Sequence, residues 1–169
     1  METTEYDCGL KARCQDKVKM TDEYEIYEQK CKALREANAE LLDGFRAWMA
    51  EKGLGAATIK KHVSNADFYI NECLTYDDPP QSAAEGVGRL DYFLGYWFIR
   101  KAMWASERSI RQNATSLKKF YTYLAETGQV SANNLAELRD DIKTGLPEWI
   151  ATVRRYDDPD VDAEDVWEW

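Results

Sequence analysis

Apolar residues recur at intervals of three and four over most of this chain, which is the spacing of one buried face of an α-helix. The first such stretch, from Thr21 to Gly53, has this stripe: Tyr24, Tyr27, Cys31, Leu34, Leu41, Phe45 and Trp48. Asn38 occupies the one missing position, so the stretch is a heptad seam with a single polar member. We expect Thr21 to cap the start of this helix and Gly53 to end it.

Four further helices are predicted by the same spacing. We expect them at Ala57 or Thr58 to Leu74, at Gly88 to Trp104, at Ser106 or Glu107 to Gly128, and at 133–143, where Pro147 ends or restarts the last one. With only 4 prolines and 9 glycines, a β protein with many turns is not expected. The sequence therefore predicts an all-α fold, a compact bundle of four to five helices with an extra N-terminal helix and an acidic tail.

Several classes of protein are disfavoured by simple counts. No run of 18 apolar residues occurs, so a membrane span is not expected. The polar N-terminus METTEYDCGLKARCQD lacks the apolar stretch of a secretory signal, and we expect a cytoplasmic protein. The four cysteines (Cys8, Cys14, Cys31 and Cys73) form no CxxC pair, and His62 is the single histidine. We therefore expect reduced thiols, no metal and no cofactor.

The acidic charge is concentrated at the two ends of the chain. The formal net charge is −9, of which residues 1–29 contribute −4 and residues 156–169 contribute −7, while residues 30–155 carry +2. We expect a flexible N-terminus over residues 1–20, a helical domain over residues 21–155 and a disordered acidic tail over residues 156–169. Within the tail, Trp167 and Trp169 are the side chains that could dock on the domain.

Two segments carry a resemblance to a known family. They are LLDGFRAWMAEKGLGAATIKKHVSNADFYI and, after an intervening helix, SERSIRQNATSLKKFYTYLAETGQVSANNLAEL. Over residues 36–142 the chain resembles the SAM-like N-terminal (core-binding) domain of phage integrases and other tyrosine recombinases. The resemblance implies a core-binding domain of four or five helices. It also implies that the second and fourth helices lie against the DNA of a recombination site.

The candidate DNA-binding residues lie on the outward faces of those two helices. They are Lys60, Lys61, His62 and Asn65, followed by Arg108, Arg111, Gln112, Thr115, Lys118 and Lys119. In the fourth helix, steps of four, three and four residues from Arg108 to Lys119 keep the polar residues on one face, opposite the apolar stripe. Such cations neutralise phosphates, and Gln112 or Asn65 could reach a base edge. The alternative is an ordinary solvated polar face.

No catalytic residue is predicted. A complete tyrosine recombinase has a second domain with the nucleophilic tyrosine and an arginine–histidine–arginine cluster, whereas 27 residues follow Ile142 here. His62 lies in HVSN rather than in an HxxR motif, and Tyr156 is followed by acidic residues. No glycine-rich phosphate loop or nucleophile elbow occurs either. We therefore expect no enzymatic activity, and no strand cleavage by this chain alone.

Two function classes remain open. The first is a DNA-binding module associated with site-specific recombination or integration of mobile DNA, with double-stranded DNA and a full-length recombinase as partners. The second is an acidic interaction or regulatory module that modulates a recombinase, or dimerises through the Tyr24–Trp48 helix. The acidic tail would act in either case as an internal DNA mimic on the basic helices or, more simply, as a solubilising segment.

Overall fold

The computed structural model describes the backbone of residues 7–167 and the side chains of residues 21–167. Within this part of the chain every regular element is helical, which confirms the predicted all-α class. The elements are, in chain order, α1 (Asp7–Glu51), α2 (Ala56–Asp67), the π-helix η1 (Phe68–Cys73), the 3₁₀-helix η2 (Glu85–Gly88), α3 (Leu90–Tyr92), the π-helix η3 (Phe93–Trp97), α4 (Phe98–Lys101), α5 (Glu107–Glu126), α6 (Ala132–Asp157) and the 3₁₀-helix η4 (Asp165–Trp167).

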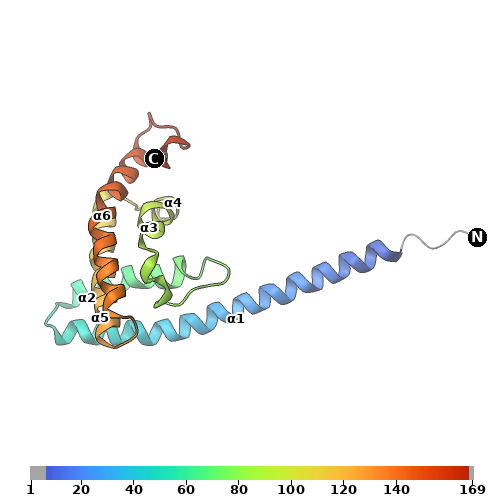
Figure 1. Ribbon diagram of the computed structural model, residues 1–169, viewed down its shortest axis with the longest axis horizontal. Coiled ribbons are helices and arrows are strands. Elements are labelled where there is room, and N and C mark those ends of the chain that lie inside the picture. The colour runs from blue at the N-terminus through green and yellow to red at the C-terminus, as the bar shows by residue number, and fades with distance from the viewer. Residues whose placement is uncertain (1–6, 168–169) are drawn as a thin grey trace, which may run out of the picture.

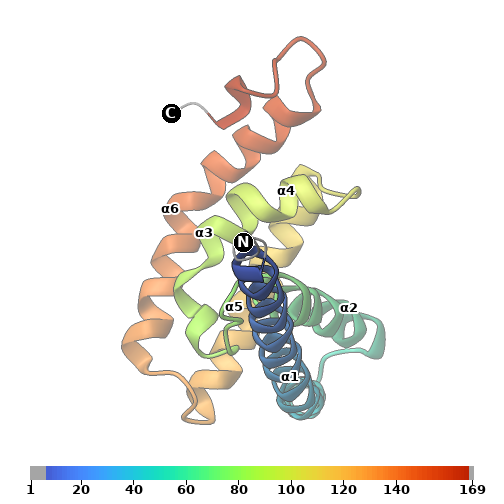
Figure 2. The ribbon, with the colours of Figure 1, turned by 90° about the vertical axis from the view of Figure 1, so that its right-hand side faces the viewer.

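The compact part is a bundle of about five helices, because α2 continues into η1, and α3, η3 and α4 follow one another without a break. Helix α2 packs on both α1 and α5, and α6 packs on α5 and on the α3–α4 helix. Figures 1 and 2 show the N-terminal part of α1 projecting from this bundle as a single helix. Helix α1 already begins at Asp7, so Thr21 lies inside the helix and is not its cap.

Aromatic side chains fill the centre of the bundle. Phe45 of α1 contacts Phe120 of α5 with ring centroids 5.3 Å apart, and Tyr69 of η1 contacts Phe93 of η3 at 4.7 Å. All four rings are fully buried. Since they come from four different elements, burial of this cluster holds the α2–η1 helix and α5 in fixed positions relative to α1.

The heptad seam of α1 is used inside the domain. Cys31, Asn38 and Phe45 are each at most 3% exposed, and the Asn38 side-chain amide donates to the Ile70 carbonyl (3.2 Å) and to Asn71 Oδ1 (2.8 Å). The seam between Cys31 and Trp48 is therefore covered by the chain itself. A dimer through the whole predicted Tyr24–Trp48 seam is incompatible with this burial.

Helix α6 runs without a break through Pro147, so the expectation that this proline ends or restarts the helix is wrong. A proline inside a helix removes one hydrogen bond and costs about 3 kcal/mol. The next turns bury Trp149, Ile150 and Val153 against the bundle. Burial of three large side chains contributes more than the proline costs, which keeps the helix continuous.

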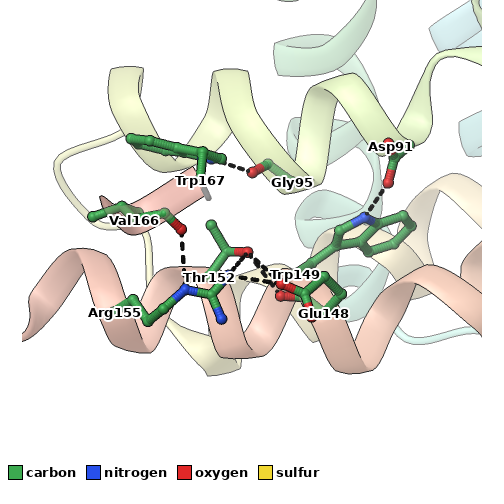
Figure 3. A network of polar contacts seen from close by, with 8 residues as sticks. All are labelled: Asp91, Gly95, Glu148, Trp149, Thr152, Arg155, Val166 and Trp167. Atoms are coloured by element: carbon green, nitrogen blue, oxygen red, sulfur yellow. Dashed lines mark hydrogen bonds and ion pairs between the residues drawn. The ribbon is translucent and has the colours of Figure 1, made fainter. Parts of the chain in front are cut away.

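Val166 and Trp167 pack on the bundle, in contrast to the disorder that the sequence predicts for residues 156–169. Val166 is 1% exposed, its carbonyl accepts from Arg155 Nε at 3.0 Å, and the Trp167 indole N–H donates to the Gly95 carbonyl at 2.9 Å (Figure 3). The predicted docking of Trp167 is thus confirmed, and it docks on η3. Trp169, the second expected contact, lies outside the described residues.

Candidate nucleic-acid interface

Helix α5 begins at Glu107, within the predicted start at Ser106 or Glu107, and a reciprocal cap closes its first turn. Ser106 Oγ accepts from the backbone N–H of Ser109 (3.2 Å), and Ser109 Oγ accepts from the backbone N–H of Ser106 (2.8 Å). Ile110, Leu117 and Leu124 on one side of the helix are fully buried. Because successive residues are turned by 100°, the opposite side of α5 faces outward with its polar residues.

The outward sides of α2 and α5 meet in a groove of about 340 Å³. The α2–α5 groove is lined by Thr58, Lys61, His62, Arg111, Gln112 and Thr115. A second hollow of about 450 Å³ adjoins it, lined by Glu107, Arg108, Arg111 and Gln112. Six of the ten predicted residues therefore line two hollows that share Arg111 and Gln112. We call this surface, together with Lys118 and Lys119, the α2–α5 face.

Ser116 connects the two helices below this face. Its hydroxyl donates to the Gln112 carbonyl (2.9 Å), accepts from Asn65 Nδ2 (2.9 Å) and lies 2.8 Å from His62 Nδ1. The single hydroxyl proton is then used, so His62 donates from Nδ1, and this neutral tautomer leaves Nε2 as an acceptor. The network fixes the spacing between α2 and α5.

His62 and Asn65 differ from the outward positions that the sequence predicts. His62 is only 8% exposed and forms the floor of the groove, while Asn65 is half-buried on Ser116. Burial lowers the pKa of His62, and the charges of Lys119 and Lys61 lower it further. The histidine is therefore a neutral, positioning side chain rather than a cation that reaches solvent.

The cations of the face differ in their partners. Arg111 pairs with Glu107 at 3.0 Å, and Arg154 from the end of α6 pairs with the same carboxylate at 2.6 Å. Hydrogen bonds from Arg154 and Arg111 lower the pKa of Glu107. Among the side chains of residues 21–167, four cations of the face make no ion pair, namely Lys61, Arg108, Lys118 and Lys119. Within the described part of the chain, Glu107 is the only carboxylate that lines either hollow.

Four predicted positions, Thr115, Lys118, Lys119 and Lys60, remain to be described. Thr115 is exposed in the groove, and its hydroxyl donates to the Arg111 carbonyl at 2.9 Å. Lys118 is exposed and Lys119 half-buried, both one turn beyond the groove on α5. Lys60 is exposed but lines neither hollow, because it is turned by 100° from Lys61 on α2. The structure therefore separates Lys60 from the other candidates.

Thr58, Glu107 and Arg154 also belong to this surface, although the sequence did not single them out. Thr58 could have been found from its spacing, because it precedes Lys61 and His62 by three and four residues. Arg154 carries no such signal. It is far from α5 in sequence, and only the packing of α6 on α5 brings it to Glu107.

Comparisons with known proteins identify no relative: no family model, no curated protein and no solved structure matches this chain. Between residues 7 and 167, no helix has the length and apolar character needed to cross a membrane. Among the side chains of residues 21–167, no group of three or more histidine, cysteine or acidic residues is arranged to hold a metal ion.

Proposed function

We propose that this chain binds double-stranded DNA through the α2–α5 face. The observation that carries the proposal is the meeting of two helices whose outward sides bring five cations together around two adjoining hollows, where Glu107 is the one carboxylate among the described lining residues. The five cations are Lys61, Arg108, Arg111, Lys118 and Lys119. Four of these cations have no acidic partner, so phosphates would meet unneutralised charge there. Half or more of the hydrogen bonds in protein–DNA complexes go to phosphate and sugar, which suits a cationic groove.

Base recognition would fall to the polar side chains between the cations. Gln112 and Thr115 line the groove beside Arg111, and a glutamine amide can make two hydrogen bonds to adenine in the major groove. The Ser116 network holds α2 and α5 at a fixed spacing, which keeps these side chains from rearranging when DNA binds. Fixed helices reduce the conformational entropy lost on binding.

The net charge of −9 opposes DNA binding at long range, and most of it lies toward the two ends of the chain. Asp22, Glu23, Glu25 and Glu28 are exposed on α1, and the acidic residues from Asp158 to Asp165 lie between the end of α6 and Trp167. The α2–α5 face itself is cationic. We therefore expect weak, strongly salt-dependent affinity rather than tight autonomous binding.

The resemblance to core-binding domains extends the proposal to site-specific recombination or the integration of mobile DNA. In that setting the chain would occupy recombination half-sites and compete with, or assist, a full-length recombinase. The placement of the cations on the second and fourth predicted helices supports this extension, because these are the helices that the resemblance assigns to DNA.

The test is fluorescence anisotropy of a labelled random-sequence duplex, titrated with the full chain at several salt concentrations. We expect log K to fall linearly with log salt, and the double variant Lys61→Glu/Lys118→Glu to lose most of the affinity and to flatten the slope. Lys61 and Lys118 are suitable because both are exposed and neither is in an ion pair.

The matched control is Lys32→Glu/Lys143→Glu, which makes the same change of net charge at exposed positions on α1 and α6. We expect it to weaken binding far less, because only distant screening is altered. Equal losses in the two double variants would show that net charge matters and that the face does not. No salt-sensitive binding by the wild type would overturn the proposal.

One observation favours a second candidate, the interaction module. Tyr24 is 63% exposed and Ile26 is 52% exposed on the part of α1 that projects from the bundle (Figure 1). A single helix in water is marginally stable, so a partner for this segment would stabilise it. Sedimentation of the full chain over a wide concentration range tests this candidate. A monomer throughout would leave self-association without support.

A further inference from the structure

The connection between α4 and α5 exposes two large apolar side chains next to each other. Met103 is 99% exposed and Trp104 is 59% exposed. Among residues 21–167, no other methionine or tryptophan has a larger exposed fraction. Exposing an apolar side chain this completely gains nothing for folding. The pair therefore calls for an explanation other than packing.

The backbone at this point is fixed. The Ser109 hydroxyl lies 3.0 Å from the Ser106 carbonyl and 3.2 Å from the Trp104 carbonyl and shares its single proton between them, and Ser109 is part of the reciprocal cap that begins α5. The N–H of Ala105 donates to the Ala102 carbonyl at 2.9 Å, which closes a turn around Met103 and Trp104. Met103 is thus presented on a rigid turn, and its exposure is built into the start of α5.

The Trp104 ring joins this turn to the end of α2. Its centroid lies 5.4 Å from that of Phe68 and 6.5 Å from that of Phe98. Phe68 follows Asn65 by three residues on the α2–η1 helix, and Trp104 precedes Arg108 by four residues. The aromatic pair therefore lies at the C-terminal end of α2 and before the N-terminus of α5, next to the end of the α2–α5 face that holds Arg108.

We infer that Met103, backed by the Trp104 ring, is an apolar wedge that enters the base stack of duplex DNA bound along the α2–α5 face. The inference rests on the proposed function and adds the mode of binding to it. Phosphates held by Arg108 and Lys61 would bring the duplex against the turn. Met103 would then separate one base-pair step, and the Trp104 ring would cover the exposed apolar edge.

Insertion of Met103 into the base stack is more favourable than leaving this side chain in water. Proteins that insert apolar side chains into DNA offset the cost of unstacking with the wider contact that a bent duplex makes. A rigid turn suits this role, because little conformational entropy is lost when the side chain inserts. Cations on the same face keep the phosphates near, so the apolar contact forms with DNA rather than with an uncharged partner.

The test uses the full chain and a series of short duplexes, each with 2-aminopurine at a different position. Each duplex also carries a donor dye at one end and an acceptor dye at the other. Anisotropy on the same duplex gives the affinity. We expect wild-type protein to raise the 2-aminopurine fluorescence at unstacked steps and to shorten the distance between the dyes.

The variant Met103→Ala should lose both signals while its affinity falls by less than about tenfold, since one partly inserted side chain contributes little beside the phosphate contacts. Met103→Leu, which remains apolar, should retain both. Ile26→Ala, which removes an exposed apolar side chain (52% exposed) from α1, is the control and should behave as the wild type. Because Met103 is fully exposed, none of these changes should alter folding.

Two results would contradict the inference, and they are distinguishable. If the wild type binds with a normal salt slope and Met103→Ala keeps the bend and the 2-aminopurine signal, the wedge is wrong and the DNA-binding face stands. If the wild type shows no salt-sensitive binding to any duplex, the proposed function is overturned and the wedge with it.

Discussion

The indole N–H of Trp149 donates a hydrogen bond to Asp91 Oδ1 over 2.7 Å, which fixes the ring between α6 and the start of α3 (Figure 3). Two glycines make room for this ring. A Cβ atom at Gly145 would lie 2.5 Å from Trp149 Cζ2, and one at Gly95 would lie 2.9 Å from Trp149 Cδ1. The ring is 2% exposed, so it has no free space into which it could move.

The first prediction concerns Gly145→Ala. Alanine favours a helix over glycine by about 1 kcal/mol, but overpacking a buried ring costs about 1–3 kcal/mol, so the clash should dominate and the free energy of unfolding should fall. Urea denaturation measures the difference. Gly55→Ala is the control, because nothing lies within 4 Å of a Cβ atom there. A more stable Gly145→Ala would mean that Trp149 can leave its site without cost.

The second prediction concerns Asn38→Ala. The Asn38 amide, 1% exposed, donates to the Ile70 carbonyl in η1. Removing it leaves this buried carbonyl and Asn71 without their partner, which should lower the free energy of unfolding by about 1–3 kcal/mol. Chemical denaturation reports the loss, with the exposed Glu40→Ala on the same helix as control. An equal effect of both variants would contradict a specific role for the amide.

The third prediction concerns the pH dependence of stability. Burial lowers the pKa of His62 in the folded protein from its usual 6.5. As the pH falls, His62 is therefore protonated in the unfolded chain at a higher pH than in the folded protein. Stability contributed by neutral His62 should therefore be complete above pH 6.5 and should be lost as the pH falls below it. Denaturation curves of the wild type and of His62→Gln should diverge as the pH falls below 6.5.

Three glutamates titrate at lower pH than His62 and set the lower limit of the pH range in which the effect of His62 can be measured. Hydrogen bonds lower the pKa values of Glu85, Glu107 and Glu126 from their usual 4.5. A carboxyl group whose pKa is lowered by folding stabilises the fold at any pH above its pKa in the unfolded chain. This stability is lost as the pH falls below that pKa. These losses begin below pH 4.5 and are common to wild type and His62→Gln. Parallel curves above that pH would show that His62 is not the titrating group.

The fourth prediction concerns Trp167→Ala. Trp167 donates to the Gly95 carbonyl, and its ring centroid lies 5.3 Å from that of Tyr96 and 5.7 Å from that of Tyr156. Loss of the hydrogen bond and of the two ring contacts should lower the free energy of unfolding by about 1–3 kcal/mol. The exposed Glu164→Ala is the control.

The same variant tests the internal DNA mimic. Trp167 is anchored on η3, so the acidic segment before it is held there. Releasing it should leave the anisotropy titration with duplex DNA unchanged at equal salt. A large gain in DNA affinity on Trp167→Ala would show instead that the anchored segment restrains the α2–α5 face.

Local signals in the sequence determined most of the helices. The start of α5 follows from Ser106, because the cap needs only residues that are three apart. The ends of α1 and α5 follow from Gly53 and Gly128, whose φ angles of 82° and 76° lie in the left-handed region that favours glycine. The outward direction of Arg108, Arg111 and Lys118 follows from the helical period alone.

Contacts between distant segments decided the rest. Pro147 predicts a helix end, but α6 continues because Trp149 is buried against α3 and η3. The acidic composition after Tyr156 predicts disorder, but Val166 and Trp167 find an apolar site on the bundle. Composition and local propensity are averages over a segment, so one or two buried side chains are enough to override them.

The candidate site shows the same division. The sequence determined that α2 and α5 each have a polar outward face, since periodicity within one helix fixes this. Only the tertiary structure decided that these faces adjoin, that His62 turns inward to Ser116, and that Arg154 reaches Glu107. The physical reason is that the position of one helix on another is set by the burial of side chains from both, and the period of either helix alone does not contain that information.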